Sequence, residues 1–198
     1  MRSTNCWWRA GRSMGRLLSM KPAEILDSLR SQKGVKLDGL PASSGLYALR
    51  DHLSEIRYIG IADTEGFRTR IYNKHTTGSE DRSHKFSCAY NVGRMWRNRH
   101  ADHGADAKVA KDLRTAFIRR HCSASFVPID GYDGRQALEK IERAVQALAT
   151  TSELTWCKGF RPTEEPTELV DQIIAKQRLT ASELGAIHRQ NLRFKDNA

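Results

Sequence analysis

The feature that most constrains the fold is a pair of short strand-like segments, residues 46–50 and 55–61, joined by only four residues. Both segments carry the apolar and aromatic side chains that strands favour, and the joining residues 51–54 have a length suited to a hairpin turn. Because side chains alternate between the two faces of a strand, Tyr47 and Tyr58 can lie on one face of such a hairpin. The sequence therefore predicts an antiparallel sheet that carries two neighbouring tyrosines.

The remaining segments are mostly helical. Apolar side chains recur at helical spacing in four segments and alternate in one, so we expect helices over residues 22–32, 67–75, 106–121 and 134–149 and a strand over residues 123–129. One or two polar helices follow residue 167. This pattern predicts an α+β fold, with a small, mainly antiparallel, three-stranded sheet in the order ββααβα and helical extensions at both ends.

The chain is long enough for one domain with appendages. We expect a basic arm and helix in residues 1–42 and a central domain in residues 43–160, with an insertion at residues 76–105. Residues 161–198 form the helical C-terminal extension. The least interpretable part is the expected insertion, which mixes glycine, serine, histidine and arginine with a few aromatic residues.

The basic charge is concentrated in the first two thirds of the chain. The net charge is +10, and residues 1–125 hold 23 Lys and Arg against 12 Asp and Glu, whereas residues 126–198 hold 10 against 11. A polyanion is the simplest partner for such a surplus, because each phosphate that a protein neutralises releases condensed counterions. Charge alone does not distinguish binding from catalysis.

The sequence has the features of a cytoplasmic protein without a membrane partner. No apolar run approaches the roughly 18 residues of a membrane span, and the basic N-terminus lacks the apolar core of a signal peptide. The four cysteines are scattered without a CxxC pair, which predicts reduced thiols. The oligomeric state stays open.

The tripeptides Gly45-Leu46-Tyr47 and Tyr58-Ile59-Gly60, with ten residues between them, resemble the motifs of the GIY-YIG nuclease superfamily. The resemblance covers roughly residues 43–160 and continues with an arginine helix and then an acidic helix. It implies an endonuclease that hydrolyses DNA phosphodiester bonds with Mg²⁺, for which Mn²⁺ can substitute.

The resemblance also implies the catalytic residues. Tyr47 is expected to act as general base on the attacking water with support from Tyr58, because a phenol can accept a proton when cations lower its pKa. Arg70, three positions after a bulky apolar residue, is expected to neutralise the phosphate, with Arg68 as the alternative. His75 follows Arg70 by five positions, where some family members have a histidine four positions on, and is expected to accept a proton or contact phosphate.

The metal ligand is expected on the helix over residues 134–149, where Glu139 and Glu142 compete. Helical spacing places Glu142 beside Ile141 at the border of the apolar face, whereas Glu139 lies on the polar side. A carboxylate at the edge of a core is costly unless it has a partner such as a divalent cation. Glu142 is therefore the preferred metal ligand.

Several interpretations stay open. Many family members carry an asparagine about a dozen residues after the glutamate, and residues 153–157 contain none, so a catalytically inactive GIY-YIG-like DNA-binding protein is the alternative function. Basic residues outside the catalytic set are expected to contact DNA, namely Arg68, Lys74, Arg94, Arg97 and Arg99. A less favoured interpretation of the same region is a zinc site made of His84, Cys88, His100 and His103.

Overall fold

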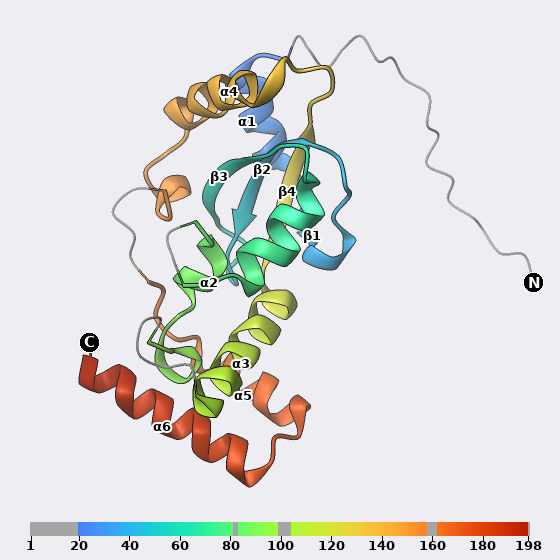
Figure 1. The fold of residues 1–198 in the computed structure, drawn as a ribbon. Coiled ribbons are helices and arrows are strands. Elements are labelled where there is room, and N and C mark those ends of the chain that lie inside the picture. The colour runs from blue at the N-terminus through green and yellow to red at the C-terminus, as the bar shows by residue number, and fades with distance from the viewer. Residues whose placement is uncertain (1–19, 81–82, 99–103, 158–161, 198) are drawn as a thin grey trace, which may run out of the picture.

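The computed structural model describes residues 20–80, 83–98, 104–157 and 162–197. Within these residues the chain forms a four-stranded antiparallel sheet with helices on both faces (Figure 1). The strand order is β1 (Val35–Lys36), β4 (Ser123–Pro128), β2 (Gly45–Arg50) and β3 (Ile56–Ala62). The α+β class and the antiparallel sheet are therefore confirmed.

The prediction of three strands misses one. Residues 35–36 pair with β4, with Val35 opposite Ala124 and Lys36 opposite Ser123. A strand of two residues is too short to show the alternation by which strands are recognised in a sequence. The central pairs are those expected, since β2 pairs with both β3 and β4.

One face of the sheet is covered by α1 (Pro22–Ser31) and α4 (Gly134–Leu148), as Figure 1 shows. The packed residues come from both helices and from β2, β3 and β4, and include Leu26, Leu46, Ile59 and Leu138. The helix expected to belong to an N-terminal appendage is thus part of the core of the sheet domain.

The other face is covered by η3 (Arg68–His75), which is a π-helix, together with α2 (Lys85–Ala89) and α3 (Ala105–His121). Helices α5 (Thr167–Gln177) and α6 (Ala181–Asn197) pack against α3, and three of their apolar residues join the same core. Short 3₁₀ turns complete the described elements at η2 (Leu37–Gly39), η4 (Gly93–Met95) and η5 (Ser152–Leu154).

An ion pair connects α1 to the turn after α4. Two nitrogens of Arg30 donate to the carboxylate of Glu153 at 2.7 and 2.9 Å. The same carboxylate accepts the backbone N–H of Thr150 at 2.7 Å. The Arg30 hydrogen bond is the main reason that the pKa of Glu153 falls to about 2, so the charged carboxylate stabilises the fold above its ordinary pKa of 4.5.

We expect Glu153→Gln to lower the free energy of unfolding by about 1 kcal/mol at pH 7, since the pair is partly exposed. Because the folded pKa is the lower one, the stabilisation is complete above pH 4.5 and is lost as the pH falls toward about 2. Urea unfolding at pH 7 and pH 3 measures this, with the exposed Glu164→Gln as control. A difference between variant and wild type that is the same at both pH values contradicts the assignment.

Candidate active site

The two tyrosines lie on one face of the β2–β3 hairpin, as predicted. Tyr47 is opposite Gly60 and Leu49 is opposite Tyr58, so the tyrosines are diagonal neighbours with ring centroids 6.0 Å apart. A Cβ on Gly60 would lie 2.5 Å from the Tyr58 ring, so the glycine makes room for that ring. Gly45 has a φ of 142°, and a Cβ there would meet the Val127 carbonyl at 2.3 Å. Close packing therefore explains the glycine of each tripeptide.

Tyr47 and His75 form a buried pair. Both side chains are 0% exposed, and the Tyr47 Oη lies 2.6 Å from the His75 Nε2. The backbone N–H of Lys85 donates to the other ring nitrogen, Nδ1, at 3.0 Å. Burial and then the charge of Arg70 hold the pKa of His75 well below its ordinary value, so the ring is neutral. Since Nδ1 is an acceptor, the proton is on Nε2 and His75 donates to Tyr47.

The π-helix brings Arg70 and His75 to the same tyrosine. A π-helix forms hydrogen bonds between residues five apart, whereas an α-helix connects residues four apart. Arg70 and His75 are five apart, and both interact with the Tyr47 phenol. Buried Phe67 and Ile71 anchor this helix in the core. Arg68 lies elsewhere, with its Nη1 donating to the Asp38 carbonyl at 3.2 Å, so Arg70 is the arginine beside the tyrosines.

Tyr47, Tyr58, Arg70 and His75 form one cluster, which we call the tyrosine cluster. Glu142 approaches it from α4. Its carboxylate is half-buried and accepts a hydrogen bond at 3.2 Å from Gln146, which also donates to the Ile59 carbonyl of β3 at 2.9 Å. Burial raises the pKa of Glu142, and Arg70 is among the cations that lower it. Glu139 pairs instead with Arg135 at 2.8 Å. Of the two glutamates, Glu142 is thus the one near Arg70 and the tyrosines.

Two further residues near Tyr58 were not predicted from the sequence. The Nζ of Lys85 lies 5.2 Å from the Tyr58 ring centroid. Cys157 also raises the pKa of Tyr58, after the larger contributions of burial and Glu142. The backbone N–H of Trp156 donates to the Arg57 carbonyl at 2.9 Å and so places this segment along β3. Lys85 belongs to the stretch with the least interpretable pattern, and Cys157 to the segment that lacks the expected asparagine.

Among the five predicted catalytic residues, Glu142 has the carboxylate that could bind a divalent ion. The described residues contain no group of three or more His, Cys, Asp or Glu side chains that could hold a metal. Mg²⁺, however, is often held by one or two carboxylates together with water and substrate phosphates. Glu142 is half-buried and forms no ion pair within the described part of the chain, so a cation would offset its charge. Of the zinc alternative, His84 bonds to Ser79, and His100 and His103 lie outside the described residues.

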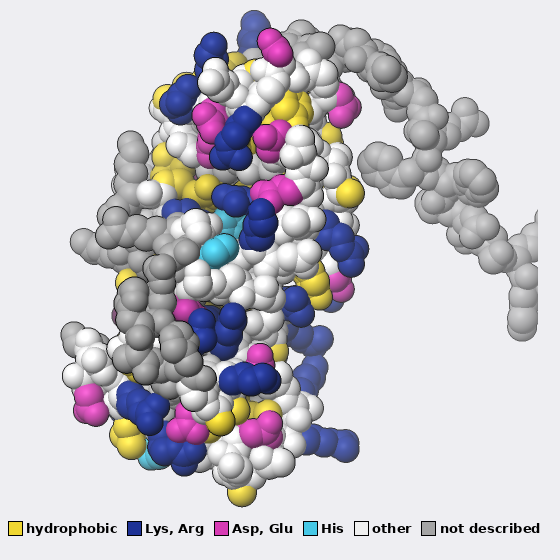
Figure 2. Space-filling model, in the orientation of Figure 1, with side chains coloured by type: hydrophobic (Ala, Val, Ile, Leu, Met, Phe, Trp, Pro, Cys, Tyr) yellow, Lys and Arg dark blue, Asp and Glu magenta, His cyan; other side chains and the backbone are white. Residues whose placement is uncertain are grey.

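Three of the residues expected to contact DNA are held in ion pairs within the protein. Arg94 pairs with Glu165 and Asp171, and Arg97 pairs with Glu80, so both guanidiniums hold parts of the fold together. Lys74 pairs with Glu65, and Arg99 lies outside the described residues. Trp96, next to Arg97 in the sequence, packs against Phe194 of α6 with ring centroids 6.2 Å apart. Side chains of both charges are mixed over the face shown in Figure 2.

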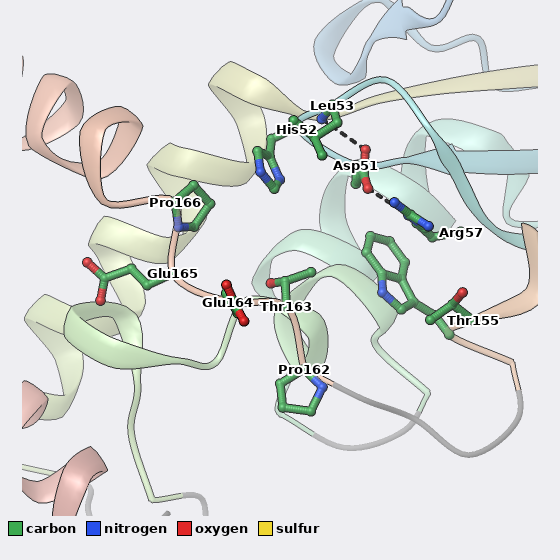
Figure 3. A pocket seen from close by; sticks show the side chains of 11 residues that line it. Asp51, His52, Leu53, Arg57, Thr155, Pro162, Thr163, Glu164, Glu165 and Pro166 are labelled. Atoms are coloured by element: carbon green, nitrogen blue, oxygen red, sulfur yellow. Dashed lines mark hydrogen bonds and ion pairs between the residues drawn. The ribbon is translucent and has the colours of Figure 1, made fainter. Parts of the chain in front are cut away.

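A pocket of about 450 Å³ lies beside the β2–β3 turn (Figure 3). Its lining includes the ion pair between Asp51 and Arg57, together with Trp156 and residues 162–166. None of the five predicted catalytic residues lines it. The tyrosine cluster is therefore separate from this pocket.

Comparisons with protein-family models, curated proteins and solved structures give no match for this chain. Among the described helices, none combines the length and the apolar character needed to cross a membrane.

Proposed function

We propose that this protein is a GIY-YIG-type endonuclease that hydrolyses DNA phosphodiester bonds with a divalent metal ion. The observation that supports it most is the convergence of the predicted catalytic residues from β2, β3, η3 and α4. These residues are Tyr47, Tyr58, Arg70, His75 and Glu142. A purely structural hydrogen bond could explain the buried Tyr47–His75 pair by itself. It would not explain why an arginine and a carboxylate able to bind a metal ion lie beside the same two phenols.

Arg70 and Lys85 supply the positive charge for a phosphate. Arg70 is 25% exposed, interacts with both tyrosines and lies 3.7 Å from the carboxylate of Glu65, and Lys85 is close to the Tyr58 ring. A guanidinium can neutralise charge that builds up on the phosphate oxygens in the transition state. Mg²⁺ bound by Glu142 would polarise the phosphate and stabilise the leaving 3′ oxygen.

Burial favours Tyr58 over Tyr47 as the general base. Tyr47 is 0% exposed and its hydroxyl accepts a hydrogen bond from His75, so it has no access to an attacking water. Tyr58 is partly exposed at the edge strand β3. Burial and the charge of Glu142 raise the pKa of Tyr58, and Arg70 and the hydrogen bond with Tyr47 offset only part of this increase. A cation bound by Glu142 would have to lower the pKa further for Tyr58 to accept a proton. We therefore assign proton abstraction to Tyr58, with Tyr47 and His75 holding it in place. This reverses the roles that the resemblance implies.

We expect Lys85→Ala to slow cleavage about tenfold, which corresponds to one charge-assisted contact to phosphate. Lys85→Arg should retain most of the rate, because it keeps the cation near Tyr58. Initial rates of plasmid nicking measure both variants, with the exposed Lys140→Ala as control. Equal rates for Lys85→Ala and the control would remove Lys85 from the site.

A DNA-binding protein that does not cleave is the second candidate. The observation that favours it is Cys157, a thiol rather than an amide, beside Tyr58. Incubation of supercoiled plasmid with and without Mg²⁺ separates the two functions. A nuclease produces relaxed circles only with the metal ion, whereas the second candidate binds the plasmid and leaves it supercoiled.

A further inference from the structure

Two guanidiniums share the ring of Tyr72. The Cζ of Arg119 lies 4.1 Å from the ring centroid, and the Cζ of Arg68 lies 5.8 Å from it. Arg68 and Tyr72 belong to η3, and Arg119 to the last turn of α3, so packing of the two helices brings the cations together. An aromatic face attracts a cation but does not neutralise it.

Neither arginine forms an ion pair with a carboxylate in the described part of the chain. Arg68 is exposed and donates to the Asp38 carbonyl, and the buried Nε of Arg119 has no hydrogen-bond partner among the described residues. The C-terminal end of α3 also favours a cation at Arg119, but only weakly. The positive charge of this pair is therefore left without a counter-charge, in contrast to Arg94 and Arg97.

We infer that Arg68, Tyr72 and Arg119 form a contact surface for the sugar-phosphate backbone of duplex DNA. This inference rests on the proposed function for the identity of the polyanion. Guanidiniums match phosphate oxygens in charge and geometry, and a shared ring holds the two at a fixed spacing. The surface is on a different side of η3 from Arg70 and His75, with exposed Asn73 and Lys74 on the same helix. The surface is therefore separate from the catalytic cluster, and binding of DNA to it can be measured independently of cleavage.

The test is the affinity of the Arg68→Gln/Arg119→Gln variant for a short duplex, measured by fluorescence anisotropy in EDTA at several salt concentrations. We expect about 10- to 100-fold weaker binding at low salt. The slope of log affinity against log salt should fall by about 2, since each lost phosphate contact lowers it by about 1. The control Arg193→Gln/Lys195→Gln removes the same charge from α6, which packs against α3.

Two further variants separate a binding role from a structural one. Tyr72→Phe keeps the ring and should bind DNA like the wild type, whereas Tyr72→Ala should bind several-fold more weakly. If the double variant fails to fold by thermal unfolding, Arg68→Gln alone should bind about tenfold more weakly, with a slope lower by about 1.

Affinity and salt slope equal to those of the control would overturn the inference, as would a wild type that does not bind the duplex. These measurements involve no cleavage. A wild type that binds through this surface but does not nick DNA would contradict the proposed function and leave the surface in place.

Discussion

Tyr58→Phe is expected to nick supercoiled plasmid about 10²- to 10⁴-fold more slowly than the wild type, the usual contribution of a general base. The substitution removes only the hydroxyl and keeps the ring that lies 6.0 Å from Tyr47 and 5.2 Å from the Lys85 Nζ. Since Tyr58 is partly exposed, the fold should be little affected. Initial rates at saturating Mg²⁺ measure the loss, and thermal unfolding checks the fold.

The matched variant is Tyr47→Phe, which should lose more stability and less nicking rate than Tyr58→Phe. Removing the buried hydroxyl leaves the Nε2–H of His75 without its acceptor, which costs about 1–3 kcal/mol of stability. The loss of nicking rate should be smaller than for Tyr58→Phe, because the Tyr47 side chain has no exposed surface. A larger loss of rate for Tyr47→Phe than for Tyr58→Phe would return the general-base role to Tyr47.

Glu142→Gln is expected to remove metal-dependent cleavage, with a loss on the order of 10²- to 10³-fold. Glutamine keeps the shape of the side chain and can still bond to Gln146, but it lacks the charge that would hold a divalent cation. Nicking rates over a Mg²⁺ titration measure the effect. Raising the Mg²⁺ concentration should restore little activity, since Glu65, the carboxylate beside Arg70, is already paired with Arg70 and Lys74.

The control is Glu139→Gln on the same helix. Glu139 pairs with Arg135 and is not needed by the proposed site, so its variant should nick DNA at nearly the wild-type rate. Comparable losses for the Glu139 and Glu142 variants would mean that the charge of α4, rather than a bound metal ion, matters for cleavage.

Much of the fold follows from local sequence patterns. The hairpin, the long helices and the shared face of Tyr47 and Tyr58 depend on alternation and helical spacing, which short segments carry by themselves. The same spacing placed Glu142 at the edge of the apolar face. The two-residue strand β1 and the packing of α1 on α4 depend on partners distant in sequence, which periodicity does not reveal.

The details of the site depend on such distant contacts. The sequence shows Arg94 and Arg97 as basic residues but does not show that Glu165 and Glu80 pair with them. Lys85 enters the cluster only because α2 packs beside η3. The π-helix, which brings residues five apart onto Tyr47, also has no simple sequence signature. Burial, the property that separates Tyr58 from Tyr47, is decided by this packing.

The most direct test of the proposed site is parallel nicking of supercoiled plasmid by the wild type and by Glu142→Gln, each with Mg²⁺ and with EDTA. We expect relaxed circles from the wild type in Mg²⁺ alone, and at most about one hundredth of that rate from the variant. Equal nicking by the two proteins, or a wild type that leaves the plasmid supercoiled in Mg²⁺, would contradict the proposed metal-dependent site.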